Sequence, residues 1–319
     1  MSAEHRAEAR VVAEAKVNLF LRVLAREDGG YHQIETLFQR LALGDDVVVR
    51  VGMPGRSLDC RGADVGPTER NLAWRAAVAY ADSAGWPNGF AIEVDKHIPA
   101  GGGLGGGSAD AGAVLRCLNA LSPAPLGTAE LLAVAARLGA DVPFLTTDAP
   151  LALGWGRGER MLALPPLPAR RVHLALFAEG VSTVEAYAGI AARRGGQGAR
   201  PTPVLWQPAR LARWDDIALV ASNDFEDVVF ATRPDVAELR EAFVGICRAY
   251  EPTAAAPDGD TTAFSLMSGS GATVFLLSPL DARGLVVTAT PPADTPDSTA
   301  LRIVETTTAT RVAPVLVAD

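Results

Sequence analysis

The sequence has 319 residues, of which 49% are hydrophobic and 21% are charged, and its formal net charge is −8. A chain of this length can bury a large core and usually forms two domains. The acidic balance argues against a nucleic-acid-binding protein, which needs a concentrated basic surface, but it leaves room for a nucleotide site built from a few oriented donors.

The cysteines and the N-terminus indicate the compartment. Cys60, Cys117 and Cys247 are widely spaced and form no CxxC pair, which favours a reducing cytoplasm over a disulfide framework. The first ten residues are polar and lack the apolar core of a signal peptide. No apolar run approaches the roughly 20 residues of a membrane span. We expect a cytoplasmic protein without a membrane segment.

The first hundred residues predict strands around one helix. Apolar residues alternate over 11–23, as in a half-buried strand, and a second strand is expected over 46–51. Residues 71–84 have helical periodicity. A third strand is expected over 90–94, where apolar residues alternate again up to Asp95.

Six glycines in seven positions follow, at 101–107, and they lead into a helix. We expect this helix to begin near Ser108, which is an acceptable N-cap, and to continue to Leu121. Another helix is predicted over 128–138, because Gly139 is a good C-terminal stop.

Prolines at 165, 166 and 168 mark the expected domain boundary, with one domain over 1–164 and the other over 165–319. The second part predicts a strand over 172–176, helices over 183–193 and 235–246, a turn at 269–271 and a strand over 272–277. A loop is expected over 252–262, and two short β-like runs in the Thr- and Pro-rich end of the chain. Strands and helices without strict βαβ alternation favour an α+β fold.

The glycine run predicts a phosphate-binding loop. Dense glycine indicates unusual φ values or a ligand pressed against the main chain, and N–H groups at a helix start attract anions. A flexible linker is the alternative, but the run is short and lies between a strand and a helix. Gly101, Gly103 and Gly106 also satisfy GxGxxG, yet the preceding strand alternates and no acidic residue closes a second strand. A Walker Lys-Ser/Thr pair is absent as well.

Three segments in the right order resemble the signatures of the GHMP kinases. They are Ala15 to Leu21, the loop Pro99 to Ala109, and Met267 to Phe275. Further blocks resemble the diphosphocytidyl-methylerythritol kinases of that superfamily: Asp28 to His32 with Thr36 to Gln39, Leu138 to Phe144, Gly180 to Ser182, and Ser222 to Glu226. The segment after Ser182 is about two residues shorter than the family pattern, and the 252–262 loop is longer.

This resemblance implies a two-domain fold, with an N-terminal domain like ribosomal protein S5, a ferredoxin-like C-terminal domain and the active site in the cleft between them. It also implies an ATP-dependent kinase that phosphorylates the 2-hydroxyl of 4-diphosphocytidyl-2-C-methyl-D-erythritol in non-mevalonate isoprenoid synthesis, with Mg²⁺ arriving with ATP. Another GHMP kinase, of the homoserine or mevalonate type, stays an alternative, as does a non-catalytic nucleotide-binding regulator. Monomer and homodimer both stay open.

Two residues carry the expected chemistry. The resemblance implies that Lys16 polarises the acceptor hydroxyl and steadies the charge of the transferred group, and that Asp141 is the catalytic base or orients that hydroxyl. From the residues alone, Lys16 could equally be a surface lysine with its stem on apolar neighbours, and Asp141 a turn or helix-cap aspartate.

The resemblance also implies the remaining site residues. The expected nucleotide-binding residues are Asn71, Lys96, Pro99, Ala100, Gly101, Gly102, Gly103, Leu104, Gly105, Gly106, Gly107, Ser108 and Ala109, with the Ser108 hydroxyl also directed toward Mg²⁺. The expected substrate-binding residues are Asn18, Tyr31, His32, Thr183, Tyr187, Gly269 and Gly271. Tyr31 and Tyr187 are expected to stack on the cytidine ring, with His32 nearby. Alternatively, Asn71 is an ordinary helix start, Lys96 a solvated strand end, and His32 an exposed turn residue.

Overall fold

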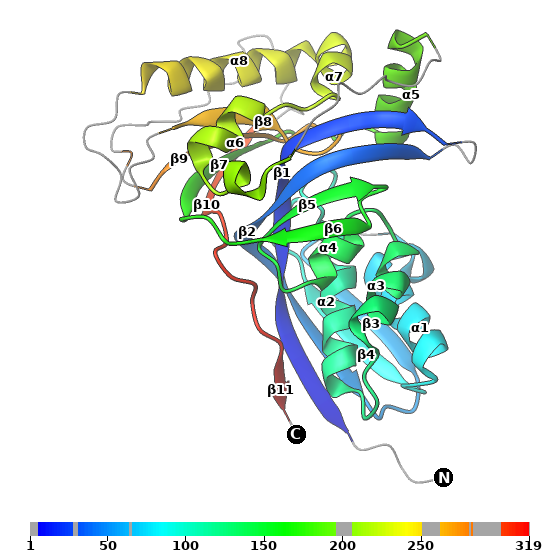
Figure 1. Cartoon of the computed structure of the whole chain (residues 1–319). Helices are drawn as coiled ribbons and strands as arrows, with labels where there is room; N and C mark the ends of the chain where they lie inside the picture. The colour runs from blue at the N-terminus through cyan, green and yellow to red at the C-terminus, as the bar shows by residue number, and fades with distance from the viewer. Residues whose placement is uncertain are drawn as a thin grey trace.

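The computed structural model describes residues 6–27, 31–63, 66–195, 206–250, 262–280, 282 and 301–318. Within these residues the strands form two separate sheets, and helices lie beside each of them (Figure 1). The mixed arrangement confirms the expected α+β class.

The larger sheet contains the two longest strands, β1 and β2, which pair antiparallel and run through both halves of the molecule (Figure 1). Its order is β11-β1-β2-β4-β3, with β5 beside β2 and β6 beside β5. Its strands are β1 (Ala7–Arg26), β2 (His32–Val51), β3 (Arg56–Arg61), β4 (Phe90–Asp95), β5 (Leu151–Gly156), β6 (Arg160–Leu164) and β11 (Leu316–Ala318). The predicted strand over 46–51 is therefore only the end of a strand that begins at His32.

Four helices cover one face of this sheet: α1 (Leu72–Ala84), α2 (Gly106–Leu121), α3 (Thr128–Ala136) and α4 (Val142–Thr146). α1 begins as predicted, because the Asn71 side chain accepts a hydrogen bond from the Ala73 N–H at 2.8 Å. Gly85, with a φ of 66°, ends the helix in the left-handed conformation.

The expected N-cap of α2 is wrong. The helix begins at Gly106, Gly105 is the cap residue with a φ of 74°, and Ser108 lies inside the first turn. A cap serine is a good signal where the chain enters a helix from an extended conformation. Here a left-handed glycine makes that entry, which leaves the Ser108 hydroxyl unused as a cap.

The smaller sheet has the order β10-β7-β9-β8, from β7 (Arg170–Leu176), β8 (Phe264–Met267), β9 (Val274–Pro279) and β10 (Arg302–Thr307). Beside it lie α5 (Thr183–Arg193), α6 (Trp214–Val220), α7 (Glu226–Thr232) and α8 (Pro234–Ala249). The strand over 172–176, the helix over 183–193, and in outline the helix over 235–246 agree with prediction. The short helices α6 and α7 were not predicted.

The chain passes from the larger sheet to the smaller one between β6 and β7, near the prolines, and returns to the larger sheet at β11, beside β1 (Figure 1). A domain boundary at residue 165 stays a prediction. The expected loop over 252–262 lies outside the described residues except for Thr262.

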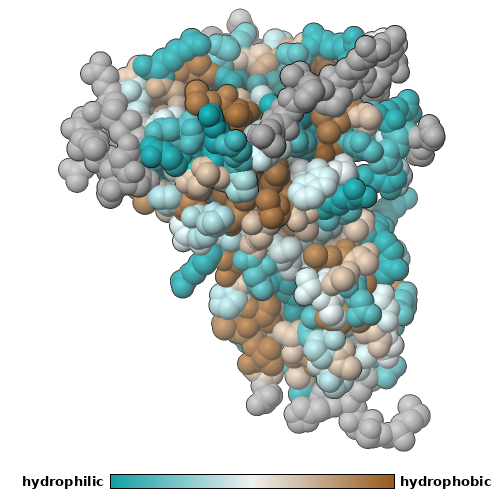
Figure 2. Space-filling model, in the orientation of Figure 1, coloured by the Kyte–Doolittle hydropathy of each residue, from teal (hydrophilic) through white to brown (hydrophobic). Residues whose placement is uncertain are grey.

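Buried side chains form one apolar cluster centred on the larger sheet and a second between the smaller sheet and α5, α7 and α8. Apolar surface also gathers along the C-terminal segment that ends in β11, where Leu316 and Val317 are exposed (Figure 2). In the described part of the chain, no helix is long and apolar enough to span a membrane.

Candidate active site

Lys16 and Asp141 meet in space although 125 positions separate them. The Lys16 Nζ lies 3.2 Å from Asp141 Oδ2. Lys16 projects from β1 and is 3% exposed, which contradicts the alternative of a surface lysine. Asp141 precedes α4, but its side chain makes no capping hydrogen bond. The carboxylate is therefore directed to the lysine and not to the helix.

The glycine loop shapes the space around Lys16. The Lys16 N–H donates to the Leu104 carbonyl at 3.0 Å, so β1 and the loop are joined at this residue. A Cβ on Gly105 would lie 3.1 Å from two carbons of the lysine side chain, and the φ of Gly105 is +74°. Glycine at 105 thus gives the loop its turn and leaves room for the lysine stem.

Polar neighbours hold the Lys16 amine in place. The amine donates to Asn18 Oδ1 at 2.8 Å, and Asn18 Nδ2 donates to Thr36 Oγ1 at 2.8 Å. The Thr36 hydroxyl donates to the Phe20 carbonyl at 2.7 Å. These buried hydrogen bonds run from β1 to β2 and fix the direction of the amine.

A cavity of about 360 Å³ opens in front of the ion pair. Its wall includes predicted site residues from both halves of the molecule: Lys16, Asn18, Gly101, Gly103, Gly105, Ser108, Asp141, Thr183, Tyr187, Gly269 and Gly271. The structure thus brings together the expected catalytic pair, part of the glycine loop and most of the expected substrate residues.

A second cavity, of about 270 Å³, lies on the other side of the glycine loop. Its wall contains Asn71, Lys96 and the loop from Pro99 to Gly107. Gly101, Gly103 and Gly105, all with positive φ, line both cavities. Because the first N–H groups of α2 have no partner inside the helix, the shared loop is suited to an anion such as a phosphate chain.

Lys96 is a buried member of a charge cluster, which contradicts the alternative of a solvated strand end. Its side chain is 5% exposed, and its Nζ bonds to Asp45 and, at 2.7 Å, to Asp110. Burial alone lowers the pKa of Lys96, but the two carboxylates outweigh it and raise that pKa. Burial raises the pKa of Asp110 to about 7, against the opposing effect of Lys96 and with a further contribution from Asp45.

The smaller sheet reaches the glycine loop through residues 268–271. The Ser268 hydroxyl donates to the Gly103 carbonyl at 2.9 Å. Asn223 Nδ2 donates to the Met267 and Gly269 carbonyls, which fixes the start of this turn. The Thr183 and Ser270 hydroxyls lie 2.8 Å apart at the cavity wall. The two halves of the molecule are therefore joined at the site itself.

The three rings expected around cytidine are arranged differently from expectation. Tyr31 is 59% exposed, and the Arg157 guanidinium lies 4.0 Å from its ring centre. His32 begins β2, which contradicts its assignment to a turn, and it stacks on Tyr187 with ring centres 4.5 Å apart. Neither Tyr31 nor His32 lines the cavity that Tyr187 lines. Burial, and to a lesser extent Asp141, raises the pKa of Tyr187 to about 12.

Sequence reasoning missed several residues of the site. Asp110 lies one residue beyond the loop Pro99 to Ala109, and Asp45 lies just before the strand expected over 46–51. Their roles depend on Lys96, which only the fold brings near both of them. Thr36 and Asn223 lie inside blocks that resemble the family, and this was their only signal.

The oxygen ligands available suit Mg²⁺. The Ser108 hydroxyl and the Asp141 carboxylate both line the larger of the two cavities. Mg²⁺ prefers oxygen and usually keeps several waters while binding one or two carboxylates and the phosphates of its substrate. Among the described residues there is no cluster of three His, Cys, Asp or Glu that could hold a metal unaided, so the ion would depend on phosphate oxygens.

Comparisons with known proteins show which family this chain resembles. A family model described as the GHMP kinases N terminal domain matches residues 71–148. A 4-diphosphocytidyl-2-C-methyl-D-erythritol kinase from Geobacter sp. (strain M21) is 36% identical over 267 residues, which are 83% of this chain and 88% of the relative. The same enzyme from Nitratidesulfovibrio vulgaris (strain DP4) is 38% identical over 269 residues, 82% of this chain and 87% of the relative.

Solved structures show the same likeness. A crystal structure of 4-(cytidine 5'-diphospho)-2C-methyl-D-erythritol kinase matches with a TM-score of 0.63 and 34% identity, over 84% of this chain and 89% of that one. A homoserine kinase from Cytophaga hutchinsonii matches with a TM-score of 0.58 over 99% of both chains. Its identity is only 15%, so it shows a shared fold and no more.

Proposed function

The chain belongs to the 4-diphosphocytidyl-2-C-methyl-D-erythritol kinases of the GHMP superfamily, and we propose that it transfers the γ-phosphoryl group of ATP to the 2-hydroxyl of 4-diphosphocytidyl-2-C-methyl-D-erythritol. The observation that carries the proposal is the 3.2 Å pair of Lys16 and Asp141, on the wall of a cavity that shares the glycine loop with a second cavity.

Each cavity has a role in the proposal. ATP lies in the cavity of Asn71 and Lys96, with its phosphates along residues 101–108 and the γ-phosphoryl group directed toward Lys16. The acceptor lies in the cavity of Asn18, Thr183 and Tyr187. Its hydroxyl oxygen bonds to the γ-phosphorus while the bond from that phosphorus to the bridging oxygen breaks, and ADP leaves.

Lys16 and Asp141 divide the work at the reacting oxygen. The Asp141 carboxylate accepts a hydrogen bond from the hydroxyl and takes its proton as the new bond forms. The Lys16 amine, held by Asn18, stabilises the negative charge on the transferred group and on the acceptor oxygen. When bound with ATP, Mg²⁺ would neutralise phosphate charge, and Ser108 and Asp141 are the protein oxygens proposed to face it.

The rings at the end of the β1–β2 hairpin are proposed to receive the cytidine. Burial, with the positive charges of Arg26 and Arg194, lowers the pKa of His32 and keeps its ring neutral at neutral pH. A neutral imidazole has one donor and one acceptor, which suits the edge of a pyrimidine. Tyr31 and Tyr187 offer aromatic faces on which the cytosine ring stacks. To stack on the face of Tyr187 that His32 now covers, the cytosine ring must displace the His32 ring.

We also propose that the protein works in the cytoplasm, where ATP is available. The hairpin aromatics favour the cytidine substrate, and the retained pair of Lys16 and Asp141 disfavours a non-catalytic regulator.

A coupled assay of ADP formation tests the proposal. Purified protein is supplied with ATP and Mg²⁺ and, in separate reactions, with 4-diphosphocytidyl-2-C-methyl-D-erythritol, homoserine or mevalonate. We expect ADP to form only with the diphosphocytidyl substrate, and phosphorus NMR to show a new phosphomonoester on its 2-position. Turnover with homoserine or mevalonate alone would overturn the substrate assignment.

A further inference from the structure

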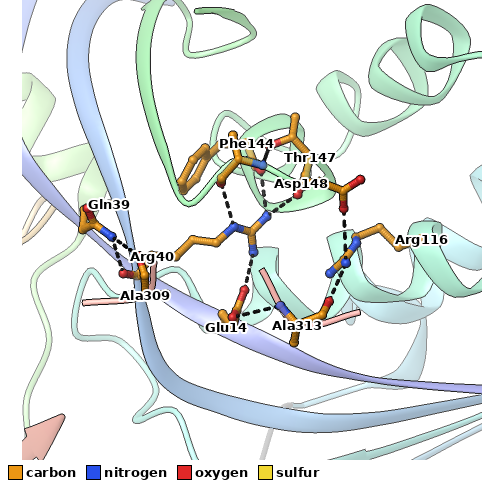
Figure 3. Close-up of polar contacts among 10 residues, drawn as sticks. Glu14, Gln39, Arg40, Arg116, Phe144, Thr147, Asp148, Ala309 and Ala313 are labelled. Atoms are coloured by element: carbon orange, nitrogen blue, oxygen red, sulfur yellow. Dashed lines mark hydrogen bonds and ion pairs between the residues drawn. The ribbon is translucent and has the colours of Figure 1, made fainter. Parts of the chain in front are cut away.

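A buried arginine connects the strand beside Lys16 to the short helix that follows Asp141. Arg40 lies on β2 directly opposite Lys16 in the β1–β2 register, and it is 1% exposed. It does not line the cavity in front of Lys16 and Asp141. Arg40 is thus buried next to the active site without facing its cavity, and Figure 3 shows the polar contacts that surround it.

The Arg40 guanidinium binds the far end of α4. Its Nη2 donates to the Phe144 carbonyl at 2.9 Å and to the Thr147 carbonyl at 2.8 Å, and its Nε donates to the Ala149 carbonyl at 3.2 Å (Figure 3). The last carbonyls of a helix have no partner within it and need donors from elsewhere. One side chain supplies donors to three of the carbonyls at and just beyond the end of α4.

The Arg40 guanidinium also forms a buried ion pair. Its Nη1 lies 3.4 Å from Glu14 Oε2, and the other Glu14 oxygen accepts the Ala313 N–H at 3.1 Å (Figure 3). Burial lowers the pKa of Arg40 to about 10, and Glu14 opposes that shift, so the guanidinium is charged at neutral pH. A buried pair of this kind is often no more stabilising than apolar residues of equal volume. Stability alone is thus a weak reason for an arginine at this place.

α4 has five residues, all of them buried, and the contacts with Arg40 are part of what holds it. Phe144 stacks on Phe38 of β2, with ring centres 4.8 Å apart, and the Arg40 guanidinium lies 5.1 Å from the Phe144 ring centre. On the opposite side, α2 approaches so closely that a Cβ on Gly112 would lie 2.5 Å from the Leu145 carbonyl oxygen. Because Asp141 is joined to α4 through the hydrogen bond from Leu145 N–H to its carbonyl at 3.1 Å, a shift of this one-turn helix moves Asp141.

We propose that Arg40 is a positioning residue for phosphoryl transfer: it ties α4 to the strand opposite Lys16 and so fixes the distance between the Asp141 carboxylate and the Lys16 amine. This inference rests on the proposed function, in which Asp141 contacts the acceptor hydroxyl. Arg40 itself touches neither nucleotide nor acceptor. Its loss should therefore lower kcat and leave the KM for ATP nearly unchanged.

Two substitutions at Arg40 test this role. Arg40→Lys keeps the charge beside Glu14 but cannot bond all three carbonyls, and Arg40→Met keeps the length and removes every donor. Because a displacement of about 1 Å can cost about 100-fold in rate, we expect kcat to fall about tenfold for the lysine variant and up to about 100-fold for the methionine variant. If Arg40→Met does not fold, the lysine variant decides the question.

Arg116→Met is the matched control. Arg116 is a second buried arginine of the same cluster. It bonds to the Asp148 side chain and to the Ala313 carbonyl, but to none of the carbonyls of residues 144–149 that Arg40 binds (Figure 3). This variant should also lose thermal stability but keep kcat within about twofold, because the Arg40 hydrogen bonds to the Phe144, Thr147 and Ala149 carbonyls remain.

A double-mutant cycle separates positioning from general stability. If Arg40 acts through Asp141, then Arg40→Lys added to Asp141→Ala should change the residual rate less than about twofold, because the group that it positions is gone. An equal fall in kcat in the parent and in the Asp141→Ala background would overturn the proposal, as would a folded Arg40→Met variant with the parent's kcat. Absence of turnover in the parent itself would instead reject the proposed function.

Discussion

At the scale of single residues, adjacent glycines of the phosphate loop are required for different reasons. A Cβ on Gly103 would lie 2.2 Å from the Ser268 carbonyl oxygen, and the φ of Gly103 is +76°. A Cβ on Gly102 would lie 2.3 Å from the Thr273 hydroxyl, where φ is ordinary. An alanine at 103 would collide with main chain and adopt a strained φ, which no second substitution relieves. An alanine at 102 would collide with one side-chain atom, which a substitution of Thr273 removes.

We therefore predict that Gly102→Ala raises the KM for ATP about tenfold or more, which corresponds to about 1.4 kcal/mol of lost binding free energy. Adding Thr273→Ala to this variant should bring the KM most of the way back to the parent's value. The hydroxyl is removed, and the next Thr273 atom lies 3.6 Å away, an ordinary contact. Gly103→Ala, as the control, should not be rescued. Steady-state kinetics of the four variants measure this, and a Gly102→Ala enzyme with the parent's KM would contradict it.

Asp110 gives a pH-dependent prediction. Its folded pKa, about 7, lies above the ordinary value of 3.8, so between these values the folded state holds a proton that the unfolded state has released. The contribution of Asp110 to stability therefore falls as pH rises from about 4 to about 7. Asp110→Asn removes this contribution.

The free energy of unfolding, measured by denaturant titration from pH 5 to 8, should thus fall with pH more steeply in the parent than in Asp110→Asn. The difference in slope is at most about 1.4 kcal/mol per pH unit, the value for one proton. Parallel profiles would mean that Asp110 is ionised throughout this range in the folded protein.

The residue types of the catalytic pair could be predicted, but their surroundings could not. Lys16 and Lys96 are the two lysines of the sequence, and both line the paired cavities. The resemblance pointed to both, as it did to Asp141. The partners of Lys96, Asp45 and Asp110, lie 51 and 14 positions from it, and no local pattern links such residues before the chain folds.

At the scale of elements, the close approach of α2 and α4 decides where Asp141 lies. The two helices touch where Gly112 faces the Leu145 carbonyl, at a distance that admits no Cβ. We predict that Gly112→Ala moves α4 and lowers kcat about 10- to 100-fold, because small displacements of reacting groups have large effects on rate.

Gly245→Ala in α8 is the matched control, since a Cβ there meets nothing within 4 Å. Alanine is favoured over glycine inside a helix by about 0.5–1 kcal/mol, so this variant should unfold at a slightly higher temperature and keep its kcat. Thermal melts and kcat measurements on both variants check the pair. Equal kcat in the two would show that helix spacing does not control the site.

Helices were predicted better than strand lengths. α1 and α5 have clear starts, because Asn71 and Ser182 accept hydrogen bonds from the N–H groups of the first turn. β2 was predicted only over its last residues. Its first part, over 32–45, pairs with β1 on one side and partly with β5 on the other, and its burial comes from these long-range partners. The start of α2 was misplaced because Gly105, in the left-handed conformation, caps the helix in place of Ser108.

At the scale of the whole molecule, the site is formed where the two sheets meet. β1 and the glycine loop supply the cation and the anion site, and the turn at 268–271 closes on the loop from the smaller sheet through the Ser268 bond to Gly103. The order of the sequence blocks indicated that they share one site. Two short β-like runs were expected at the end of the chain, but the pairing of β11 with β1 had no sequence signal, because a three-residue strand carries too little periodicity to indicate its partner.

The central claim is that Lys16 and Asp141 converge on the hydroxyl that receives the phosphoryl group. The single-turnover rate of transfer from ATP to 4-diphosphocytidyl-2-C-methyl-D-erythritol by Asp141→Asn, measured by rapid quench with saturating ATP, tests it most directly. The account predicts a fall of about 10²- to 10⁴-fold, the usual contribution of a general base, with ATP affinity within about threefold of the parent. An Asp141→Asn enzyme that transfers phosphate at the parent's rate would contradict it.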